Sequence, residues 1–194
     1  MTESFTLHDR DIREPLFEYL EAVNEKVRIL EEIVMGDSRA DAVMVTEGFL
    51  TGIEIKSDAD TYARLKSQVK DYNRYFDYNM VVVGSHHALH VEEHVPEWWG
   101  ILSVEWMGNR LDIYSVRECK LNPKSVTRRK LDLLWKRELF DILDSNGLPK
   151  YRQKSRAFIA GQLMKKMDES DLNSAVSEEL FERDYTIFDD QHQQ

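Results

Sequence analysis

The sequence has little of what builds secreted or membrane proteins. Its 194 residues include a single cysteine, Cys119, which excludes a framework of intramolecular disulfides. The longest apolar runs, such as MVVV at 80–83, are far shorter than the roughly 20 residues that a membrane-spanning helix needs. The opening stretch MTESFTLHDRDIREP lacks the basic-then-apolar pattern of a signal peptide. We therefore expect a soluble cytoplasmic protein without membrane contact, long enough to bury a hydrophobic core.

Positive charge is scarce overall, but its distribution along the chain is uneven. The formal net charge is −10 at pH 7, and the ends are acidic, with −11 over residues 1–109 and −8 over residues 167–194. Residues 110–166 carry 15 basic and 6 acidic side chains. Such a segment could face phosphates, because charges act locally, within about 8 Å at physiological salt. The alternative is a pair of solvated helices rich in lysine and arginine.

Hydrophobic periodicity divides the chain into helices and strands. Helical spacing predicts helices over 11–23, 60–76 and 126–144, with one or two more between 153 and 183. Other runs predict strands within 27–56 and over 79–84, 96–106 and 110–118. The result is an α/β fold, whose mixed sheet combines an antiparallel meander with a parallel-type buried strand and is flanked by helices. We divide the chain into a core with its following helix (1–146), a helical C-terminal extension (147–183) and a disordered tail (184–194).

The stretch GIEIK, residues 52–56, places an acid and a base on one face of a strand. Glu54 and Lys56 are two positions apart, so their side chains point the same way. If Glu47-Gly48 is a two-residue hairpin loop, Asp41 lies directly opposite Glu54 on the preceding strand. Opposed residues have Cβ atoms about 4.5–5.5 Å apart. The sequence therefore predicts a second acid beside Glu54.

A third acid follows from the same argument. If Gly36-Asp37 is also a two-residue loop, Glu32 lies opposite Asp41 on its other side. This register favours Glu32, although Glu31 and the glutamates of the first helix remain alternatives: Glu14, Glu18 and Glu21.

A row of acids is not what stability alone would favour. Two carboxylates about 5 Å apart repel each other by about 3 kcal/mol at an effective dielectric constant of ~20. Lys56 offsets part of this repulsion, and a divalent cation would offset more. Hard oxygen ligands with open positions suit Mg²⁺ or Mn²⁺, with Asp41 and Glu54 as the ligands. The alternative is a surface ion pair between Glu54 and Lys56 on an edge strand.

An acid, then Asp41, then Glu54-Ile55-Lys56 resembles the motif of the PD-(D/E)XK nuclease superfamily, which has the restriction-endonuclease-like fold. The resemblance implies that Asp41 and Glu54 bind the metal and that the backbone carbonyl of Ile55 completes its shell. It implies that Lys56 assists hydrolysis of a phosphodiester, as base or charge stabiliser. Glu32 would be an auxiliary ligand through water.

Further motifs extend the resemblance. Gln68 and Tyr72 match the Q-x-x-x-Y element of the RecB-like and lambda-exonuclease-like branches, in which the Gln reaches back to the active site. Residues 52–84, with VPEWWGI and NPKSVTRRKLDLLWKREL, are similar to a family of bacterial and phage proteins classed as PD-(D/E)XK-like. The similarity covers roughly residues 9–143. One departure is Ala40, where the superfamily motif has Pro before the Asp. From spacing alone, Gln68 could equally be a boundary residue and Tyr72 a core residue.

The resemblance implies a Mg²⁺- or Mn²⁺-dependent nuclease that acts on DNA in repair, phage biology or defence. It could act alone, as a homo-oligomer or with a partner protein. The alternative is a catalytically silent nuclease-fold protein that binds nucleic acid or another protein. Candidate contacts to DNA phosphates are basic, with an ion pair or a solvated helix face as the alternative: Arg39, Lys124, Arg128, Arg129 and Lys130.

Overall fold

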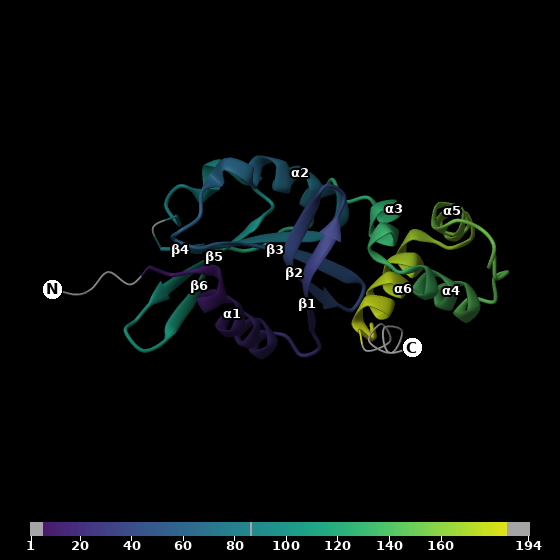
Figure 1. Cartoon of the computed structure of the whole chain (residues 1–194), viewed down its shortest axis with the longest axis horizontal. Helices are drawn as coiled ribbons and strands as arrows, with labels where there is room; N and C mark the ends of the chain where they lie inside the picture. Colours follow the sequence, from purple (N-terminus) through teal and green to yellow (C-terminus); the bar gives the residue numbers. More distant parts are fainter. Residues whose placement is uncertain (1–5, 86, 186–194) are drawn as a thin grey trace, which may run out of the picture.

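The computed structural model describes residues 6–85 and 87–185, which form a six-stranded sheet with helices on both faces (Figure 1). The strands lie side by side in chain order: β1 (Arg28–Met35), β2 (Ser38–Thr46), β3 (Phe49–Lys56), β4 (Tyr78–Gly84), β5 (Gly100–Trp106) and β6 (Leu111–Arg117). β3, β4 and β5 run parallel, and the remaining neighbours pair antiparallel. The predicted mixed sheet is therefore confirmed.

Each face of the sheet has its own hydrophobic core. α1 (Asp9–Val23) packs on one face through Ile12, Leu16 and Leu20, against side chains that include Ile53 and Ile55. α2 (Leu65–Tyr75) follows a 3₁₀ turn (Tyr62–Arg64) and covers the other face. Because α2 connects two parallel neighbours, β3 and β4, it begins near the end of β3 that carries the predicted acid and base.

The C-terminal helices pack beyond the β1–β3 end of the sheet, as Figure 1 shows at the green and yellow end of the chain. They are α3 (Thr127–Lys130), α4 (Lys136–Ser145), α5 (Arg156–Lys166) and α6 (Glu169–Phe181). The N–H of Gly48, in the β2–β3 loop, donates to Ser177 Oγ of α6 at 2.9 Å. Two helices, α5 and α6, occupy the range 153–183, where one or two were predicted. Most of the predicted disordered tail, residues 186–194, lies outside the described residues.

The single helix predicted over 126–144 is wrong. The chain forms α3, a 3₁₀ turn (Leu131–Leu133), an extended link and then α4. Two guanidinium groups bind the carbonyl groups that a continuous helix would use internally. Arg183 Nη2 donates to Leu133 O at 2.8 Å, and Arg156 Nη2 donates to the carbonyls of Asp132 and Leu134. The apolar stripe survives the break, which is why periodicity alone did not reveal it.

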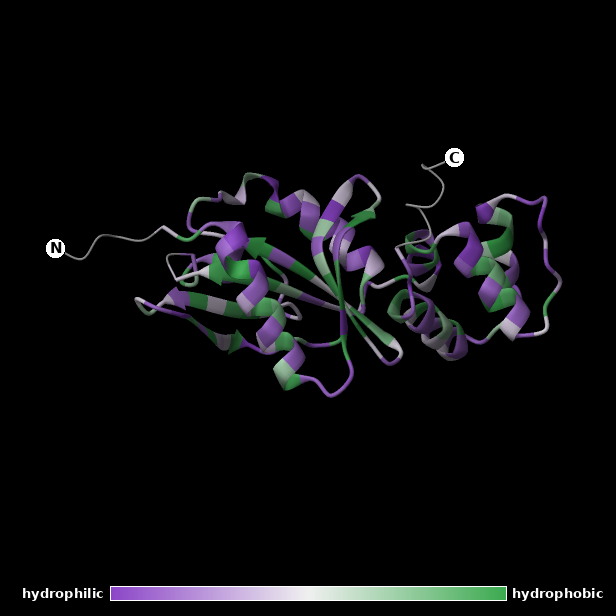
Figure 2. Ribbon diagram, turned by 60° about the horizontal axis from the view of Figure 1, so that its bottom comes forward, coloured by the Kyte–Doolittle hydropathy of each residue, from purple (hydrophilic) through white to green (hydrophobic). Residues whose placement is uncertain are grey.

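Hydrophobic residues gather in the central strands and on the inward sides of the helices (Figure 2). Within residues 6–85 and 87–185, no helix combines the length and the apolar character required to cross a bilayer.

Candidate functional site

Both predicted hairpin loops are present, and both predicted strand registers are confirmed. The β1–β2 pairs on either side, Glu31 with Ala42 and Ile33 with Ala40, place Glu32 across from Asp41. Extending the β2–β3 register by one residue places Asp41 across from Glu54. The backbone ladder between β2 and β3 ends one pair earlier, at Ala42 and Ile53. Asp41 therefore lies where the two strands stop sharing backbone hydrogen bonds, and its side chain is free to take part in a site.

Glu32 interrupts the regular alternation of β1. Its φ of +56° is in the left-handed region, which non-glycine residues rarely adopt. Leu30 and Ile33, three positions apart, both face the same core, so the strand changes face at Glu32. As a consequence, Glu31 and Glu32 are both exposed on the same side, although consecutive strand residues ordinarily point to opposite faces.

The side chain of Asp41 accepts a hydrogen bond from the backbone of β3. Its Oδ2 accepts a hydrogen bond from the N–H of Ile55 at 2.8 Å, and its own N–H donates to the hydroxyl of Tyr72 at 3.3 Å. Burial, together with repulsion by Glu54, raises the pKa of Asp41 to about 7, although Ile55 N–H and Lys56 oppose the shift. The acid is thus poised between its charged and neutral forms near neutral pH.

Glu54 is fully buried and is held by three side chains. Its Oε1 accepts from Lys56 Nζ and Gln68 Nε2, both at 2.5 Å, and its Oε2 lies 2.7 Å from the Tyr72 hydroxyl. Burial and the charges of Glu54 and Asp41 raise the pKa of Tyr72 well above its usual value, so Tyr72 stays protonated as a donor. The alternatives of a surface ion pair and of a boundary glutamine are therefore wrong for Glu54, Lys56 and Gln68.

These side chains line a polar cavity of about 330 Å³ at the carboxyl end of β3. The predicted residues that it brings together are Arg39, Asp41, Glu54, Ile55, Lys56 and Gln68. The remaining lining residues are polar or charged and were not predicted: Asp9, Asp37, Ser38, Asp60, Arg64 and Ser67. Acids and bases therefore line the same opening, which suits a site for a phosphate and a cation.

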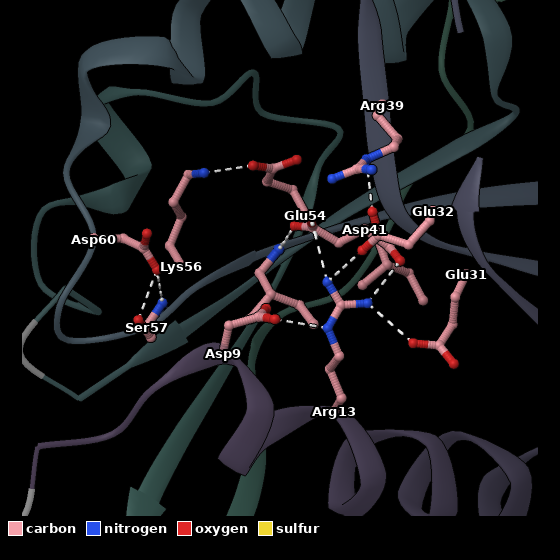
Figure 3. A network of polar contacts seen from close by, with 12 residues as sticks. Asp9, Arg13, Glu31, Glu32, Arg39, Asp41, Glu54, Lys56, Ser57 and Asp60 are labelled. Atoms are coloured by element: carbon pink, nitrogen blue, oxygen red, sulfur yellow. Dashed lines mark hydrogen bonds and ion pairs between the residues drawn. The ribbon is translucent and has the colours of Figure 1, made fainter. Parts of the chain in front are cut away.

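The predicted third acid does not reach this cavity. Glu32 accepts from Arg13 Nη2 at 2.8 Å and from Arg39 Nε at 2.6 Å, and Glu31 accepts from Arg13 Nη1 at 3.1 Å (Figure 3). Guanidinium groups bind both acids, and neither acid lines the cavity. The acid that lines the cavity from the first helix is Asp9, which precedes the glutamates considered from the sequence.

Four of the five predicted phosphate contacts lie outside the cavity. Lys124 Nζ lies 5.0 Å from the centre of the Trp98 ring, while Arg128 and Arg129 form ion pairs with Asp132. These three side chains remain partly or fully accessible.

Lys130 differs from them, because it is 2 % exposed and pairs with Asp77 and Asn173. A side chain buried to this degree cannot contact a DNA phosphate. Its ion pair with Asp77 instead joins α3 to the start of β4.

Arg13 was missed, although it is the most connected side chain of this region. The stretch DRDIRE places Asp9 and Arg13 four residues apart, which indicates an ordinary ion pair on a helix. Nothing in that spacing reveals that α1 crosses the sheet where Glu32 and Asp41 lie. The role of Arg13 depends on this long-range packing, and sequence periodicity does not encode it.

The residues of the cavity fit a hard divalent cation better than a soft one. Within the described part of the chain, no three His, Cys, Asp or Glu side chains are arranged to hold a metal ion. Mg²⁺ needs fewer, because it keeps several waters and binds through one or two carboxylates. Gln68 Oε1 is buried in this region without a hydrogen-bond partner among the described residues, and burial together with the charge of Glu54 raises the pKa of Asp41. Asp41, Glu54 and this amide oxygen form a group of hard oxygen ligands.

Comparison with known proteins places the chain in one family. No curated protein and no solved structure matches it. The family model described as bacteriophage P4 protein cII matches residues 3–193, nearly the whole chain. The chain therefore belongs to the bacteriophage P4 protein cII family.

Proposed function

We propose that the protein is a Mg²⁺- or Mn²⁺-dependent nuclease that hydrolyses phosphodiester bonds in DNA. The observation that carries the proposal is the convergence of Asp41, Glu54 and Lys56 in one polar cavity, with Lys56 Nζ 2.5 Å from Glu54 Oε1. The resemblance of these residues to the PD-(D/E)XK motif supports it, as does the mixed sheet that positions them.

Asp41 and Glu54 would hold the cation, with the backbone carbonyl of Ile55 and the amide oxygen of Gln68 as neutral neighbours. When bound, the cation supplies a Lewis acid that lowers the pKa of water and offsets negative charge on a phosphate. The carboxylate of Asp41 is oriented by Ile55 N–H, which binds its Oδ2, so the direction of the carboxylate is fixed before any ion arrives. This preorganisation is the contribution of the strand itself.

Lys56 is best suited to stabilise charge. Its Nζ donates to Glu54 Oε1 and its side chain is only 7 % exposed, so the adjacent acid holds it in place at the cavity. From there it can donate to the oxygens of a phosphate as negative charge accumulates on them. Lys56 therefore acts in this proposal through its position beside the phosphate.

Gln68 and Tyr72 position Glu54. Both reside on α2 one turn apart, and each donates to a different oxygen of the Glu54 carboxylate. A carboxylate bound on both oxygens cannot rotate freely, which fixes the direction of its remaining lone pairs. The helix that follows the catalytic strand thus locks the acid in place.

Arg39 and Arg64 are the basic groups best placed to bind DNA phosphates near the cavity. Both line it, and the Arg39 side chain is 64 % exposed while it pairs with Glu32. An exposed arginine can exchange an ion pair for a phosphate at little cost, because a surface ion pair contributes only about 0–1 kcal/mol. Lys124, Arg128 and Arg129 flank Val126, whose N–H donates to Arg74 O at the end of α2, so they lie away from the cavity.

One observation favours the second candidate, a silent nuclease-fold module. Both oxygens of Glu54 are satisfied by protein donors, so the acid has no unmet need for a cation. A silent protein would bind DNA with an affinity that does not depend on Mg²⁺. It would show no turnover with any DNA structure.

A cleavage assay separates the two. Linear duplex, nicked, branched and single-stranded DNA are incubated with Mg²⁺ or Mn²⁺ and with wild type, Lys56→Ala or Lys70→Ala. Lys70 is an exposed lysine of α2 and is the matched control. We expect cutting by wild type and by the control, and a loss of about 100-fold or more in Lys56→Ala. Equal cutting by Lys56→Ala would refute the assignment. DNA binding by a folded wild type that never cuts would favour the silent module.

A further inference from the structure

The guanidinium group of Arg13 lies among the carboxylates behind the proposed site (Figure 3). Nε donates to Asp9 Oδ2 at 2.6 Å, and Nη1 donates to Glu31 Oε2 and to the backbone carbonyl of Asp41, both at 3.1 Å. Nη2 donates to Glu32 Oε1 at 2.8 Å and lies 3.7 Å from Asp41 Oδ1. One cation therefore contacts acids from α1, β1 and β2.

The position of Arg13 is fixed by packing. Its side chain is 18 % exposed, and its neighbours Ile12 and Leu16 on α1 are fully buried against the sheet. Burial alone would lower the pKa of Arg13, but the hydrogen bond and charge of Asp9, with the acids of β1 and β2, raise it above its usual value. The guanidinium is thus a permanent positive charge at a defined place.

The backbone of β1 departs from regular strand geometry where it contacts Arg13. The left-handed φ of Glu32 turns the consecutive side chains of Glu31 and Glu32 toward the same guanidinium. Such a conformation in a non-glycine residue costs of order 1 kcal/mol or more and persists where the surroundings impose it. Both acids and the strained backbone therefore belong to one arrangement with Arg13 at its centre.

Asp41 is shared between this arrangement and the proposed metal site. Its Oδ2 faces Ile55 N–H at the cavity, and its Oδ1 and backbone carbonyl face Arg13. A carboxylate shared in this way is the group that two cations would bridge in a two-metal site, where the ions lie roughly 3.5–4 Å apart. On one side of Asp41 the chain leaves an open polar cavity, and on the other side it supplies a cation of its own.

We propose that Arg13 is an internal cation that fills the position of a second metal ion beside Asp41, and so restricts the acidic region to one divalent cation. The inference rests on the proposed function, because it assumes that Asp41 and Glu54 bind an ion. Arg13 is a positioning and specificity residue in this view. It sets how many ions the site accepts, while Lys56 supplies the second positive charge at the phosphate.

The test is a Mn²⁺ titration of the metal-free full chain by isothermal calorimetry, followed by electron paramagnetic resonance. Wild type should bind one ion and show no coupling between Mn²⁺ centres. Arg13→Gln removes the charge and should raise the stoichiometry from one to two, with spin coupling between the two ions. Arg13→Lys keeps the charge and should bind one. Arg39→Gln removes the other arginine that contacts Glu32, and should also bind one.

Each outcome decides the inference. Wild type that already binds two coupled ions would overturn it, as would a folded Arg13→Gln that binds no more ions than wild type. If wild type binds no ion but Arg13→Gln binds one, the internal cation stands and the proposed metal-dependent function falls. If neither binds Mn²⁺, both fall.

Arg13→Gln could be unstable without metal, because its acids then repel one another. Its melting temperature is therefore measured with increasing Mn²⁺. A larger rise than in wild type supports the inference, since binding of two ions stabilises more than binding of one. The absence of any such rise would contradict it.

Discussion

The N–H of Ile55 donates to Oδ2 of Asp41 at 2.8 Å, so a side-chain carboxylate takes a hydrogen bond at the point where the β2–β3 ladder ends. This bond orients an acid whose charged form is disfavoured by burial and by Glu54. The arrangement keeps the geometry of Asp41 fixed while its charge is poorly compensated. A divalent cation bound as proposed would supply the positive charge that is missing here.

The first prediction is that Asp41→Asn stabilises the metal-free protein at pH 8. The folded pKa of Asp41, about 7, exceeds its ordinary value of 3.8, so the native state binds more protons than the unfolded state between these values. The contribution of Asp41 to the free energy of unfolding is therefore fully present below about pH 4, and it is lost as the pH rises through 7. Asparagine retains an acceptor for Ile55 and carries no charge.

Urea denaturation in EDTA at pH 4 and pH 8 measures this effect. We expect a gain on the order of 2 kcal/mol at pH 8 and little change at pH 4. Asp112→Asn, in the exposed part of β6, is the control and should change little at either pH. An Asp41→Asn protein that is destabilised at pH 8 would contradict the account of its environment.

The second prediction concerns Tyr72→Phe. The substitution keeps the ring in the core and removes the hydroxyl that lies 2.7 Å from Glu54 Oε2. Glu54 is fully buried, so its carboxylate loses a donor that water does not replace. We expect a loss of about 1–3 kcal/mol in the free energy of unfolding, and weaker Mn²⁺ binding in calorimetry because the acid is less well oriented. Unchanged stability and unchanged Mn²⁺ affinity together would exclude a positioning role.

The third prediction is that Gly52→Ala disrupts the contact between β3 and α2. A Cβ atom at Gly52 would lie 2.2 Å from Cδ2 of Phe76 and 2.7 Å from Cδ1 of Tyr72, so the two rings must move. Such overpacking costs about 1–3 kcal/mol. Because Tyr72 also holds Glu54, the cavity should lose Mn²⁺ affinity at the same time.

Gly161→Ala provides the matched control. Gly161 lies inside α5, and its added Cβ would contact nothing within 4 Å. Alanine is the better helix former by roughly 1 kcal/mol, so this variant should be slightly stabilised. Thermal melts of the two variants should therefore shift in opposite directions, and a shift in the same direction would contradict the argument from close approach.

The part of the site predictable from sequence is the part set by local rules. Two loops of two residues fixed the pairing of Asp41 with its neighbours, because hairpin length determines register. The positive φ of Glu32 could not be predicted from such rules, because glutamate has no preference for that conformation. The contact between Arg13 and Asp41 spans 28 residues and depends on where α1 crosses the sheet. Single-sequence periodicity reports which face is buried, but not what that face meets.

The C-terminal helices illustrate the same limit. Leu131 and Leu139 are both buried, as one apolar stripe predicted, yet the helix is broken between them. The break depends on arginines that come 20 or more residues later and bind the freed carbonyls. A local pattern cannot reveal a partner at that distance.

The fourth prediction follows from one of those arginines. Arg183 forms two 2.7 Å hydrogen bonds to Glu138, with side-chain exposures of 3 % and 7 %, and its guanidinium lies 4.2 Å from the centre of the Trp135 ring. Arg183→Met leaves the Glu138 carboxylate buried without its cation. It also removes the donor that binds the carbonyl of Leu133. We expect a loss of about 3–5 kcal/mol in the free energy of unfolding, because an uncompensated buried charge is strongly destabilising.

The double variant Glu138→Gln/Arg183→Met tests this reason. Removing the acid together with the arginine eliminates the unpaired charge, so the double variant should be more stable than Arg183→Met alone. Urea denaturation gives the free energy of unfolding of each variant. If the double variant were less stable than the single variant by the full cost of losing Glu138, the two residues would contribute independently. The ion pair would then not be what holds the start of α4 to the end of the chain.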